Sequence, residues 1–313
     1  MKIGFIGLGN VGSKLAKSLL RNKFGIIVRD LDNKLTKEFS KLGAAIASSP
    51  KELAQNSDLI ITCLPSLEVC SKVMEADDGV IKGLSKNKIW LEMSTTDSAE
   101  VKRIGALVKS VGAIPLDCPV SGGCHRAATG NIAILVSGDK NAFNKILPAL
   151  SAMGRKILHT GELGNASVLK VITNYLASVN LVLVGEALTV AKKSGMDLKT
   201  TYEAIKISSG NSFVHETESQ VILNGSYNIS FTMDLILKDM GLFNDLSIKN
   251  NIPLELSPLV LDIFRDGQKK YGPKAWSSMI VKRLEDACNI NLRAEGFPAE
   301  LIDSEPEEKG HQI

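Results

Sequence analysis

The stretch GELGNASVLKVITNYLASVNLVLVGEALTVAKKSG, residues Gly161–Gly195, decides how the chain is organised. Its segment Asn165–Lys193 has no proline, consists mainly of good helix formers and apolar residues, and is bracketed by glycines, which predicts one long helix. The uncharged run Val171–Gly185 is shorter than the roughly 18 to 20 residues that cross a bilayer. A helix that is apolar on most faces in a soluble protein packs on all sides, as a spine between domains or subunits does.

One charged residue, Lys170, stands inside this apolar stretch, and Asn174 follows one turn later on the same face. For a lone lysine, the simplest explanation is a side chain that carries its ammonium group out to solvent. The functional explanation is proton transfer, because apolar neighbours such as Val171 lower the pKa of a lysine by desolvation. We therefore take Lys170 and Asn174 as the candidate catalytic pair.

Composition narrows the class of protein. The 313 residues suggest about two domains, and a formal charge of +3 with interspersed signs indicates neither a nucleic acid nor a membrane partner. Five cysteines without a C-x-x-C pair, and histidines that do not cluster with them, favour reduced thiols and no metal site. The chain enters an apolar strand at Lys2 and Ile3 without a charged leader, so we expect a cytoplasmic protein.

The first twelve residues, MKIGFIGLGNVG, read as a buried strand that breaks into glycines and resumes as a helix. Gly7, Gly9 and Gly12 fit G-x-G-x-x-G, in which the glycines allow a tight turn, backbone approach to a pyrophosphate and close helix packing. The phosphates of a dinucleotide would then lie on the helix N-terminus. A lone match of this kind is weak, but its position between a strand and a helix is the right one.

Asp30 follows the next apolar run, Ile26–Val28. A carboxylate there can accept hydrogen bonds from an adenosine ribose and would repel a 2′-phosphate, which favours NAD over NADP. Arg29 keeps NADP as a less favoured alternative, and a surface turn is the simplest role for Asp30.

Strand-like and helical segments then alternate, which predicts a doubly wound parallel sheet. The expected strands are 58–64, 88–93, 113–117, 132–137 and 156–158, and the expected helices are 51–55, 67–83 and 98–111. Ligands of such sheets bind beyond the carboxyl ends of the strands, where three loops follow. They are Leu64–Ser66, Ser94–Thr96 and Asp117–Gly123.

The organisation predicted for the whole chain has four parts. Residues 1–163 form the dinucleotide-binding domain, 164–194 the long helix and 195–292 an all-helical domain. The final residues, 293–313, combine proline, acidic residues and few apolar ones, which predicts a mobile tail.

With these motifs in order, the chain resembles the β-hydroxyacid dehydrogenase family, which includes 3-hydroxyisobutyrate dehydrogenase and tartronate semialdehyde reductase. The resemblance covers about residues 1–290 and rests on four ordered motifs. They are GLGNVG, the D-x-P-V-S-G-G loop at Asp117–Gly123, the G-x-x-G-x-x-x-x-x-K-x-x-x-N start of the long helix at Gly161–Asn174, and Lys238-Asp239 in FTMDLILKDMGL.

The resemblance implies an α/β fold with an N-terminal Rossmann domain, a long interdomain helix and an all-α C-terminal domain, assembled as a homodimer or homotetramer. It implies that Lys170 is the catalytic lysine and that Asn174 helps to hold the substrate. Cofactor contacts are implied at Gly7, Leu8, Gly9, Asn10, Val11, Gly12, Asp30, Leu64, Pro65, Thr95 and Lys238. Substrate contacts are implied at Ser121, Gly122 and Gly123 and at Gly210, Asn211 and Ser212.

Two departures limit what carries over. The first helix lacks the family's M-G-x-P-M-A-x-N-L continuation, having Val11, Lys14, Leu15 and Ser18 instead. His125 and Arg126 follow the glycine loop where relatives have small or neutral residues. Solvated surface is the simplest role for both, and the sharper hypothesis is that one of them, such as Arg126, selects the distal end of the substrate.

The predicted function is an NAD-dependent oxidoreductase that interconverts a short 3-hydroxy acid and its aldehyde or ketone by hydride transfer, with Lys170 as general acid and base. Two alternatives share the scaffold. One is a non-catalytic dinucleotide-binding protein, which the retained Lys170 and Asn174 disfavour. The other is an imine reductase, for which we expect a different residue at position 170. The sequence does not identify the hydroxy acid.

Overall fold

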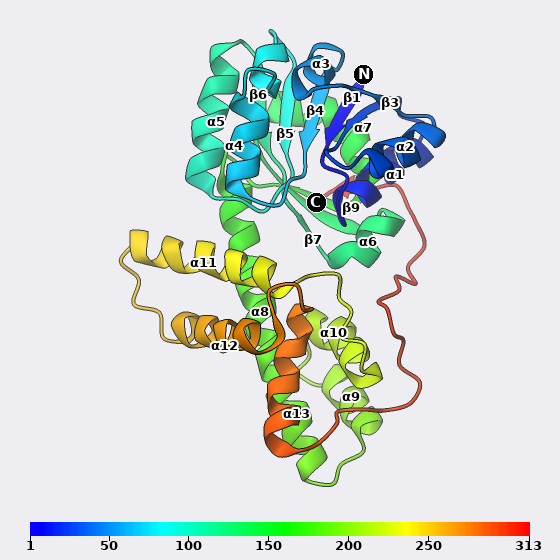
Figure 1. Ribbon diagram of the computed structural model, residues 1–313, viewed down its shortest axis with the longest axis vertical. Helices are drawn as coiled ribbons and strands as arrows, with labels where there is room; N and C mark the ends of the chain where they lie inside the picture. The colour runs from blue at the N-terminus through cyan, green and yellow to red at the C-terminus, as the bar shows by residue number, and fades with distance from the viewer. The chain divides into compact units, whose positions relative to one another are not determined.

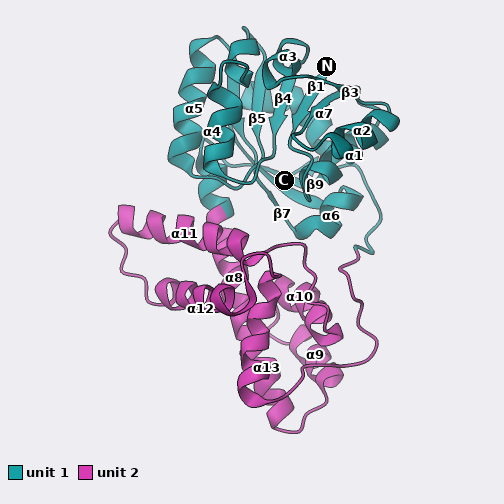
Figure 2. Cartoon of the chain, in the orientation of Figure 1, with its two compact units in different colours: residues 1–170, 303–313 teal, residues 171–302 magenta.

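The computed structural model describes residues 1–313, whose elements are labelled in Figure 1. The chain forms two compact units, and Figure 2 distinguishes them by colour. Unit 1 comprises Met1–Lys170 together with Asp303–Ile313, and unit 2 comprises Val171–Ile302. The first turns of the long helix therefore belong to unit 1, as does the end of the chain.

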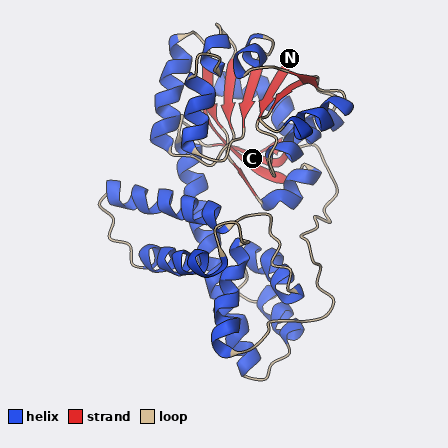
Figure 3. Ribbon diagram, in the orientation of Figure 1, coloured by secondary structure: helices blue, strands red, loops and turns tan.

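Unit 1 is built on the sheet drawn in red in Figure 3. The parallel part of this sheet has the strand order β3-β2-β1-β4-β5-β6. This is the dinucleotide-binding strand order, and it confirms the predicted doubly wound sheet. Ile3 in the central strand lies opposite Ile26 on one side and Leu59 on the other. The strands are β1 (Ile3–Ile6), β2 (Ile26–Arg29), β3 (Ala45–Ile46), β4 (Leu59–Thr62), β5 (Ile89–Glu92) and β6 (Ile114–Asp117).

The sheet continues beyond β6 with strands of mixed direction. β8 (Ile132–Gly138) runs antiparallel to β6, and β9 (Gly154–His159) runs parallel to β8. The short β7 (Val120–Ser121) pairs with β8, and β10 (His311–Gln312) pairs with the outer edge of β9. The last strand of the sheet is thus supplied by the C-terminus of the chain.

Strand residues alternate between two apolar layers because successive side chains point to opposite faces. Phe5 and Ile61 pack on the side that also holds Leu15, Phe143 and Ile146 from α1 and α7. On the other face, residues from α3, α4 and α5 cover Ile6, Ile60 and Trp90. The helices of unit 1 are α1 (Gly12–Arg21), α2 (Asn33–Lys41), α3 (Pro50–Gln55), α4 (Leu67–Glu75), η1 (Val80–Gly83), α5 (Ser98–Ser110), α6 (Gly123–Thr129) and α7 (Lys140–Met153).

The long helix α8 spans Asn165–Lys193, the residues that the sequence predicts. Its packing differs from the expected burial on all sides, because Leu176 and Leu183 are each 54% exposed and Val190 is 65% exposed. Its opposite side, with Leu181, Val184 and Leu188, enters the core of unit 2. By length and composition alone α8 could cross a membrane, a test that the core helix of a soluble protein also passes.

Unit 2 is helical, as predicted for the C-terminal part of the chain. Its core gathers Phe264, Met233 and Tyr202 around the buried side of α8. Besides the rest of α8 it contains α9 (Leu198–Lys206), α10 (Phe213–Asn224), α11 (Met233–Lys249), α12 (Leu256–Tyr271), η2 (Ser277–Val281) and α13 (Lys282–Cys288).

The end of the chain differs from the predicted mobile tail. Residues 303–313 lie along unit 1, where β10 joins the sheet and Gly310 N–H donates to the Ser151 carbonyl over 2.9 Å. The physical reason is charge pairing. Arg21, Arg126 and Arg155 each form an ion pair with a glutamate of this segment, so acidic composition leads here to docking.

Candidate functional site

The fingerprint loop, Gly7–Gly12, connects β1 to α1. Gly7 has a φ of +97°, and a Cβ atom on it would lie 2.2 Å from the Cys63 carbonyl oxygen. A Cβ on Gly12 would lie 2.0 Å from the Gly7 carbonyl oxygen. Glycine is required at both positions by the protein's own backbone.

Gly9 is different, because no atom lies within 4 Å of a Cβ built there. The residue before α1, Val11, provides no side-chain cap, and Ser13 N–H and Lys14 N–H donate to the backbone carbonyls of Gly9 and Val11. The open space beside Gly9, at the N-terminal end of α1, is the feature that fits the pyrophosphate of a dinucleotide. Leu8, Asn10 and Val11, the other predicted cofactor contacts, lie in this loop.

Alanine substitutions at Gly9 and Gly12 separate the role in cofactor binding from the role in folding. Gly9→Ala is expected to leave the melting temperature of the free protein nearly unchanged while raising the Kd of the dinucleotide by about tenfold or more, about 1.4 kcal/mol. Gly12→Ala is expected to destabilise the free protein, because its Cβ meets backbone. Thermal unfolding and a fluorescence titration of the reduced dinucleotide measure both. Equal destabilisation by both substitutions would contradict this division.

Asp30 lies at the carboxyl end of β2 and reaches the fingerprint loop. Its Oδ2 accepts a hydrogen bond from Leu8 N–H over 2.6 Å, and its Oδ1 accepts one from Asp32 N–H over 2.9 Å. Each carboxylate oxygen keeps a further lone pair for a ribose hydroxyl. The guanidinium of Arg29 donates to the Asp30 carbonyl oxygen. The structure therefore brings Asp30 to the loop, and its contact with the ribose stays a prediction.

A buried carboxylate, Glu92, organises the loops that contain Leu64, Pro65 and Thr95. Glu92 accepts from Thr62 Oγ1 and from Ser94 N–H, each over 2.7 Å. Ser94 Oγ in turn accepts from Leu64 N–H over 2.8 Å. These hydrogen bonds connect the carboxyl ends of β4 and β5, which are followed by the predicted nicotinamide contacts. No local pattern in the sequence indicates this role for Glu92.

Burial raises the pKa of Glu92 to about 7. The hydrogen bonds from Ser94 and Thr62 act in the opposite direction and lower this pKa. A carboxyl group whose pKa is raised by folding binds its proton more tightly in the folded than in the unfolded state. Its contribution to stability is therefore favourable at low pH and is lost as the pH rises toward the folded-state pKa.

Glu92→Gln removes this titration. We expect the variant's unfolding free energy, relative to the wild type, to increase by about 2–3 kcal/mol between about pH 5 and pH 8. Urea unfolding at several pH values measures the difference. A relative stability of Glu92→Gln that stays constant with pH would contradict a raised pKa.

The carboxylate loop, Ser121–Gly123, connects β7 to α6. Gly122 has a φ of +127° and Gly123 a φ of +87°, which are values that favour glycine. The N-cap position of α6, Gly122, has no side-chain cap, so the N–H groups around it are open to an anion. The predicted substrate residues of unit 1 are thus gathered in one turn.

Asp117, at the start of the same motif, is fully buried and caps the long helix. Its Oδ2 accepts from Ser167 N–H over 2.7 Å, and its Oδ1 accepts from Ser167 Oγ over 2.9 Å. Ser137 Oγ donates to Asp117 and accepts from Gly164 N–H and Ala166 N–H. Burial raises the pKa of Asp117 to about 6, opposed by these hydrogen bonds. The motif was visible in the sequence, but this capping role was not.

Lys170 follows Ser167 by one helical turn and is 8% exposed. A lysine that carries its charge to solvent is usually more exposed, so this burial favours the functional explanation over the simplest one. The hydrogen bonds that fix the start of α8 also fix the direction in which the Lys170 side chain leaves the helix. Its catalytic role stays a prediction.

Asn174, Lys238 and Asp239 meet within unit 2. Asn174 Nδ2 donates to Asp239 Oδ2 over 2.5 Å, and Lys238 Nζ lies 3.2 Å from Asp239 Oδ1. Asp239 is 2% exposed and joins the two predicted site residues. In the sequence, Asp239 is recognisable only as a member of the Lys238-Asp239 motif.

The predicted substrate loop of unit 2 has local structural roles. Asn211 Nδ2 donates to Glu216 Oε1 over 2.6 Å, and Ser212 Oγ caps α10 by accepting from His215 N–H over 3.0 Å. These bonds hold the loop after Gly210 at the start of α10. Contact with a substrate stays a prediction for these residues.

Neither His125 nor Arg126, which follow the carboxylate loop, lies on a fully solvated surface. Arg126 is half-buried and forms an ion pair with Glu305 over 2.7 Å. His125 is also partly buried, and burial lowers its pKa. The simplest prediction for the pair was surface exposure, and the structure differs because the C-terminal segment covers this side of α6.

Comparison with known proteins agrees with this geometry. A family model described as the NAD binding domain of 6-phosphogluconate dehydrogenase matches residues 2–161. Residues 164–284 match a model described as NAD-binding of NADP-dependent 3-hydroxyisobutyrate dehydrogenase.

Individual relatives match along most of the chain. Mitochondrial 3-hydroxyisobutyrate dehydrogenase of Rattus norvegicus is 32% identical over 88% of this chain and 85% of the relative. The 2-(hydroxymethyl)glutarate dehydrogenase of Eubacterium barkeri is 30% identical over 93% and 97%. The crystal structure of 3-hydroxyisobutyrate dehydrogenase from Salmonella typhimurium is 28% identical, covers 90% of this chain and 99% of its own, and has a TM-score of 0.82. The chain therefore belongs to the β-hydroxyacid dehydrogenase family of NAD(P)-dependent enzymes.

Proposed function

We propose that the protein is an NAD-dependent dehydrogenase that interconverts a short 3-hydroxy acid and its aldehyde or ketone, with Lys170 as general acid and base. The observation that carries the proposal is the burial of Lys170 one turn after a helix start that Asp117 fixes. Burying a lysine is costly, and general acid–base chemistry is a reason to retain one in this position.

The proposed chemistry divides between cofactor and protein. A nicotinamide ring supplies the hydride acceptor or donor. Lys170 accepts the hydroxyl proton when the alcohol is oxidised and returns a proton when the carbonyl group is reduced. Its charge also stabilises the alkoxide that develops on the substrate oxygen. The N–H groups of Ser121–Gly123 hold the substrate carboxylate.

The preference for NAD rests on Asp30. Its carboxylate is held beside the fingerprint loop by Leu8 N–H, so a dinucleotide on this loop would meet a fixed negative charge near its adenosine ribose. Such a carboxylate accepts hydrogen bonds from the ribose hydroxyl groups and repels a 2′-phosphate. Arg29 is the residue that could offset this repulsion, but its guanidinium already donates to the Asp30 carbonyl oxygen.

The substrate class rests on the relatives' chemistry. The names of the rat and Eubacterium barkeri enzymes specify substrates that share a hydroxymethyl group on the carbon next to a carboxylate. We infer the same arrangement here, because the carboxylate loop and Lys170 offer one anion site and one proton donor. A second, distal carboxylate would need another cation, for which Arg126 is the candidate.

An activity screen tests the proposed function. 3-Hydroxyisobutyrate, 2-(hydroxymethyl)glutarate, glycerate, serine, threonate and 4-hydroxybutyrate are each assayed with NAD and NADP by the absorbance of the reduced nicotinamide. We expect turnover of at least one 3-hydroxy acid, with kcat/KM higher for NAD by about tenfold or more, about 1.4 kcal/mol. Binding of NAD without reduction by any acid would favour a non-catalytic dinucleotide-binding protein. Reduction of cyclic imines alone would favour an imine reductase.

We also propose that the chain works as a homo-oligomer. Leu176, Leu183 and Val190 are exposed at intervals of seven residues along α8, which makes one apolar stripe. An exposed stripe of this kind on a soluble protein is best covered by a second copy of the same stripe, because both copies then bury the same groups. Sedimentation velocity measures the expected dimer or tetramer, and a monomer at all concentrations would contradict it.

A further inference from the structure

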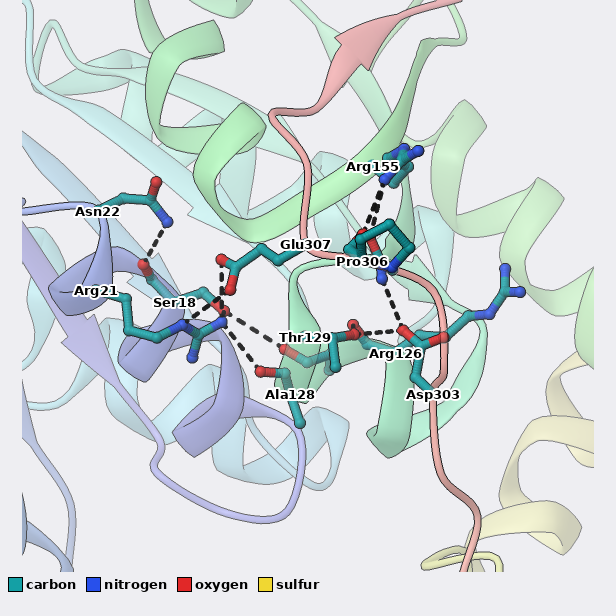
Figure 4. A network of polar contacts seen from close by, with 12 residues as sticks. Ser18, Arg21, Asn22, Arg126, Ala128, Thr129, Arg155, Asp303, Pro306 and Glu307 are labelled. Carbon is teal, nitrogen blue, oxygen red and sulfur yellow. Dashed lines mark hydrogen bonds and ion pairs between the residues drawn. The ribbon is translucent and has the colours of Figure 1, made fainter.

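The C-terminal strap, residues 303–313, returns to unit 1 and follows its surface to the sheet edge (Figure 1). Both matched family models end before it, the second at residue 284. Figure 4 shows its polar contacts, which reach the end of α1, the end of α6 and the strand β9. This is an extensive set of contacts for a terminal segment whose composition predicts mobility.

We propose that this strap is a positioning element of the substrate site, which holds α6 and thereby the carboxylate loop Ser121–Gly123 in its binding geometry. The proposal rests on the proposed function for the identity of the loop's ligand. Asp303 and Glu305 would then influence substrate affinity without touching a reacting atom.

The first contact is at the carboxyl end of α6. Asp303 Oδ2 accepts from the Thr129 hydroxyl and from Asn131 Nδ2, the latter over 2.8 Å. Asn131 Nδ2 also donates to the Glu305 carbonyl oxygen over 3.0 Å. α6 has only seven residues, so a bond at Thr129 restrains the whole helix up to its first residue, Gly123. Gly123 is also the last residue of the carboxylate loop.

The second contact reaches the loop more directly. Arg126 Nη2 donates to Glu305 Oε1 over 2.7 Å. A Cβ built on Gly122 would lie 3.3 Å from Arg126 Cδ, so the arginine stem lies against the loop's backbone. Glu305 therefore fixes a side chain that forms one wall of the carboxylate loop.

The far end of the strap is anchored independently, which keeps the acidic residues in place. Glu307 pairs with Arg21 over 3.2 Å, and Glu308 pairs with Arg155 over 2.5 Å. Gly310 passes so close to β9 that a Cβ on it would lie 1.8 Å from the Gly154 carbonyl oxygen. With β10 in the sheet, loss of the Asp303 and Glu305 contacts should loosen α6 while the strand pairing remains.

The test uses the full chain with Asp303→Asn and Glu305→Gln combined, which removes the charges and keeps the size of both side chains. Amide hydrogen exchange of peptides covering residues 118–131 is the readout that does not depend on activity. We expect the exchange rate in this region to rise by about tenfold, because the equilibrium constant for local opening of α6 should increase by that factor. We also expect KM for the hydroxy acid to rise by about fivefold while kcat changes by less than about twofold. This pattern is typical of a lost interaction that binds the ground state and the transition state equally.

Two further variants complete the design. Glu38→Gln removes a matched exposed pair with Lys17 elsewhere on unit 1 and should leave both readouts unchanged. A variant that neutralises all four acidic strap residues, Asp303, Glu305, Glu307 and Glu308, should show a larger exchange effect than the double variant. The unchanged readouts of Glu38→Gln distinguish a strap from a general loss of surface charge, and the larger effect of the fourfold variant shows that the far anchors contribute.

The outcomes separate the two proposals. Faster exchange at residues 118–131 without turnover of any acid keeps the strap and contradicts the proposed function. Turnover with unchanged exchange and unchanged KM in both the double and the fourfold variant contradicts the strap and keeps the function. Faster exchange spread evenly over unit 1 also contradicts it, because the effect would then be one of overall stability.

Discussion

Lys170→Ala is expected to lower kcat for the hydroxy acid by about 10²- to 10⁴-fold, the range that one general acid–base group usually contributes. The physical reason is that the substrate hydroxyl group loses its proton acceptor while every group that we assign to the dinucleotide remains. The Kd of the dinucleotide should therefore change little. Steady-state kinetics and a fluorescence titration measure the two quantities.

Lys193→Ala is the matched control for this substitution. Lys193 is an exposed lysine in the last turn of the same helix, so removing it changes the charge and composition of α8 without touching the site. It should leave kcat unchanged. Turnover by Lys170→Ala within about tenfold of the wild type would show that another group moves the proton.

The second large effect is expected for Asp117→Ala, which removes both oxygens that accept from Ser167. Leaving buried donors without an acceptor costs about 1–3 kcal/mol of folding free energy. Because α8 then starts without its fixed cap, Lys170 should leave the helix in a less defined direction, and misplacement by about 1 Å can lower kcat by as much as 10²-fold. Urea unfolding and steady-state kinetics measure both consequences.

A cap elsewhere in unit 1 separates stability from catalysis. Asp139 caps α7 by accepting from Ala142 N–H over 2.7 Å, and Asp139→Ala should cost about 1 kcal/mol of stability without changing kcat. Loss of stability in both variants with kcat unchanged in both would contradict a positioning role for Asp117. Asp117→Asn, which keeps one acceptor, should fall between the wild type and Asp117→Ala in kcat.

The parts of the fold that the sequence predicts depend on local patterns. Gly7 and Gly12 are close together in the chain and need a backbone conformation or an approach that only glycine allows. The long helix follows from helix-forming residues between glycines, and the doubly wound sheet follows from the alternation of strands with helices. The bounds of α8, Asn165–Lys193, are the predicted ones because glycines and polar residues mark both ends.

The missed features depend on pairs of residues that are distant in the chain. Asp117 meets Ser167 fifty positions later, and nothing near either residue indicates the bond. Glu92 is similar, because a glutamate at the end of an apolar strand does not reveal that Thr62 lies opposite it. For such residues the sequence gives the motif, and the structure is needed for the role.

The C-terminal strap shows the same limit for composition. Its acidic residues predict disorder when they are considered alone, because the segment has few apolar groups to bury. Their basic partners come from three separate elements, at Arg21, Arg126 and Arg155. Only the folded unit 1 brings these arginines to one surface, so the docking could not be predicted from the segment itself.

Chemical rescue by added amines tests whether Lys170 moves the proton during hydride transfer. The rate of NADH formation by Lys170→Ala is measured with the best hydroxy acid while small primary amines of increasing basicity are added. We expect the amines to restore turnover in proportion to their concentration, and more strongly as their basicity increases, as general base catalysis requires. An unrestored rate across all amines, with wild-type turnover unaffected by them, would contradict the assignment of Lys170.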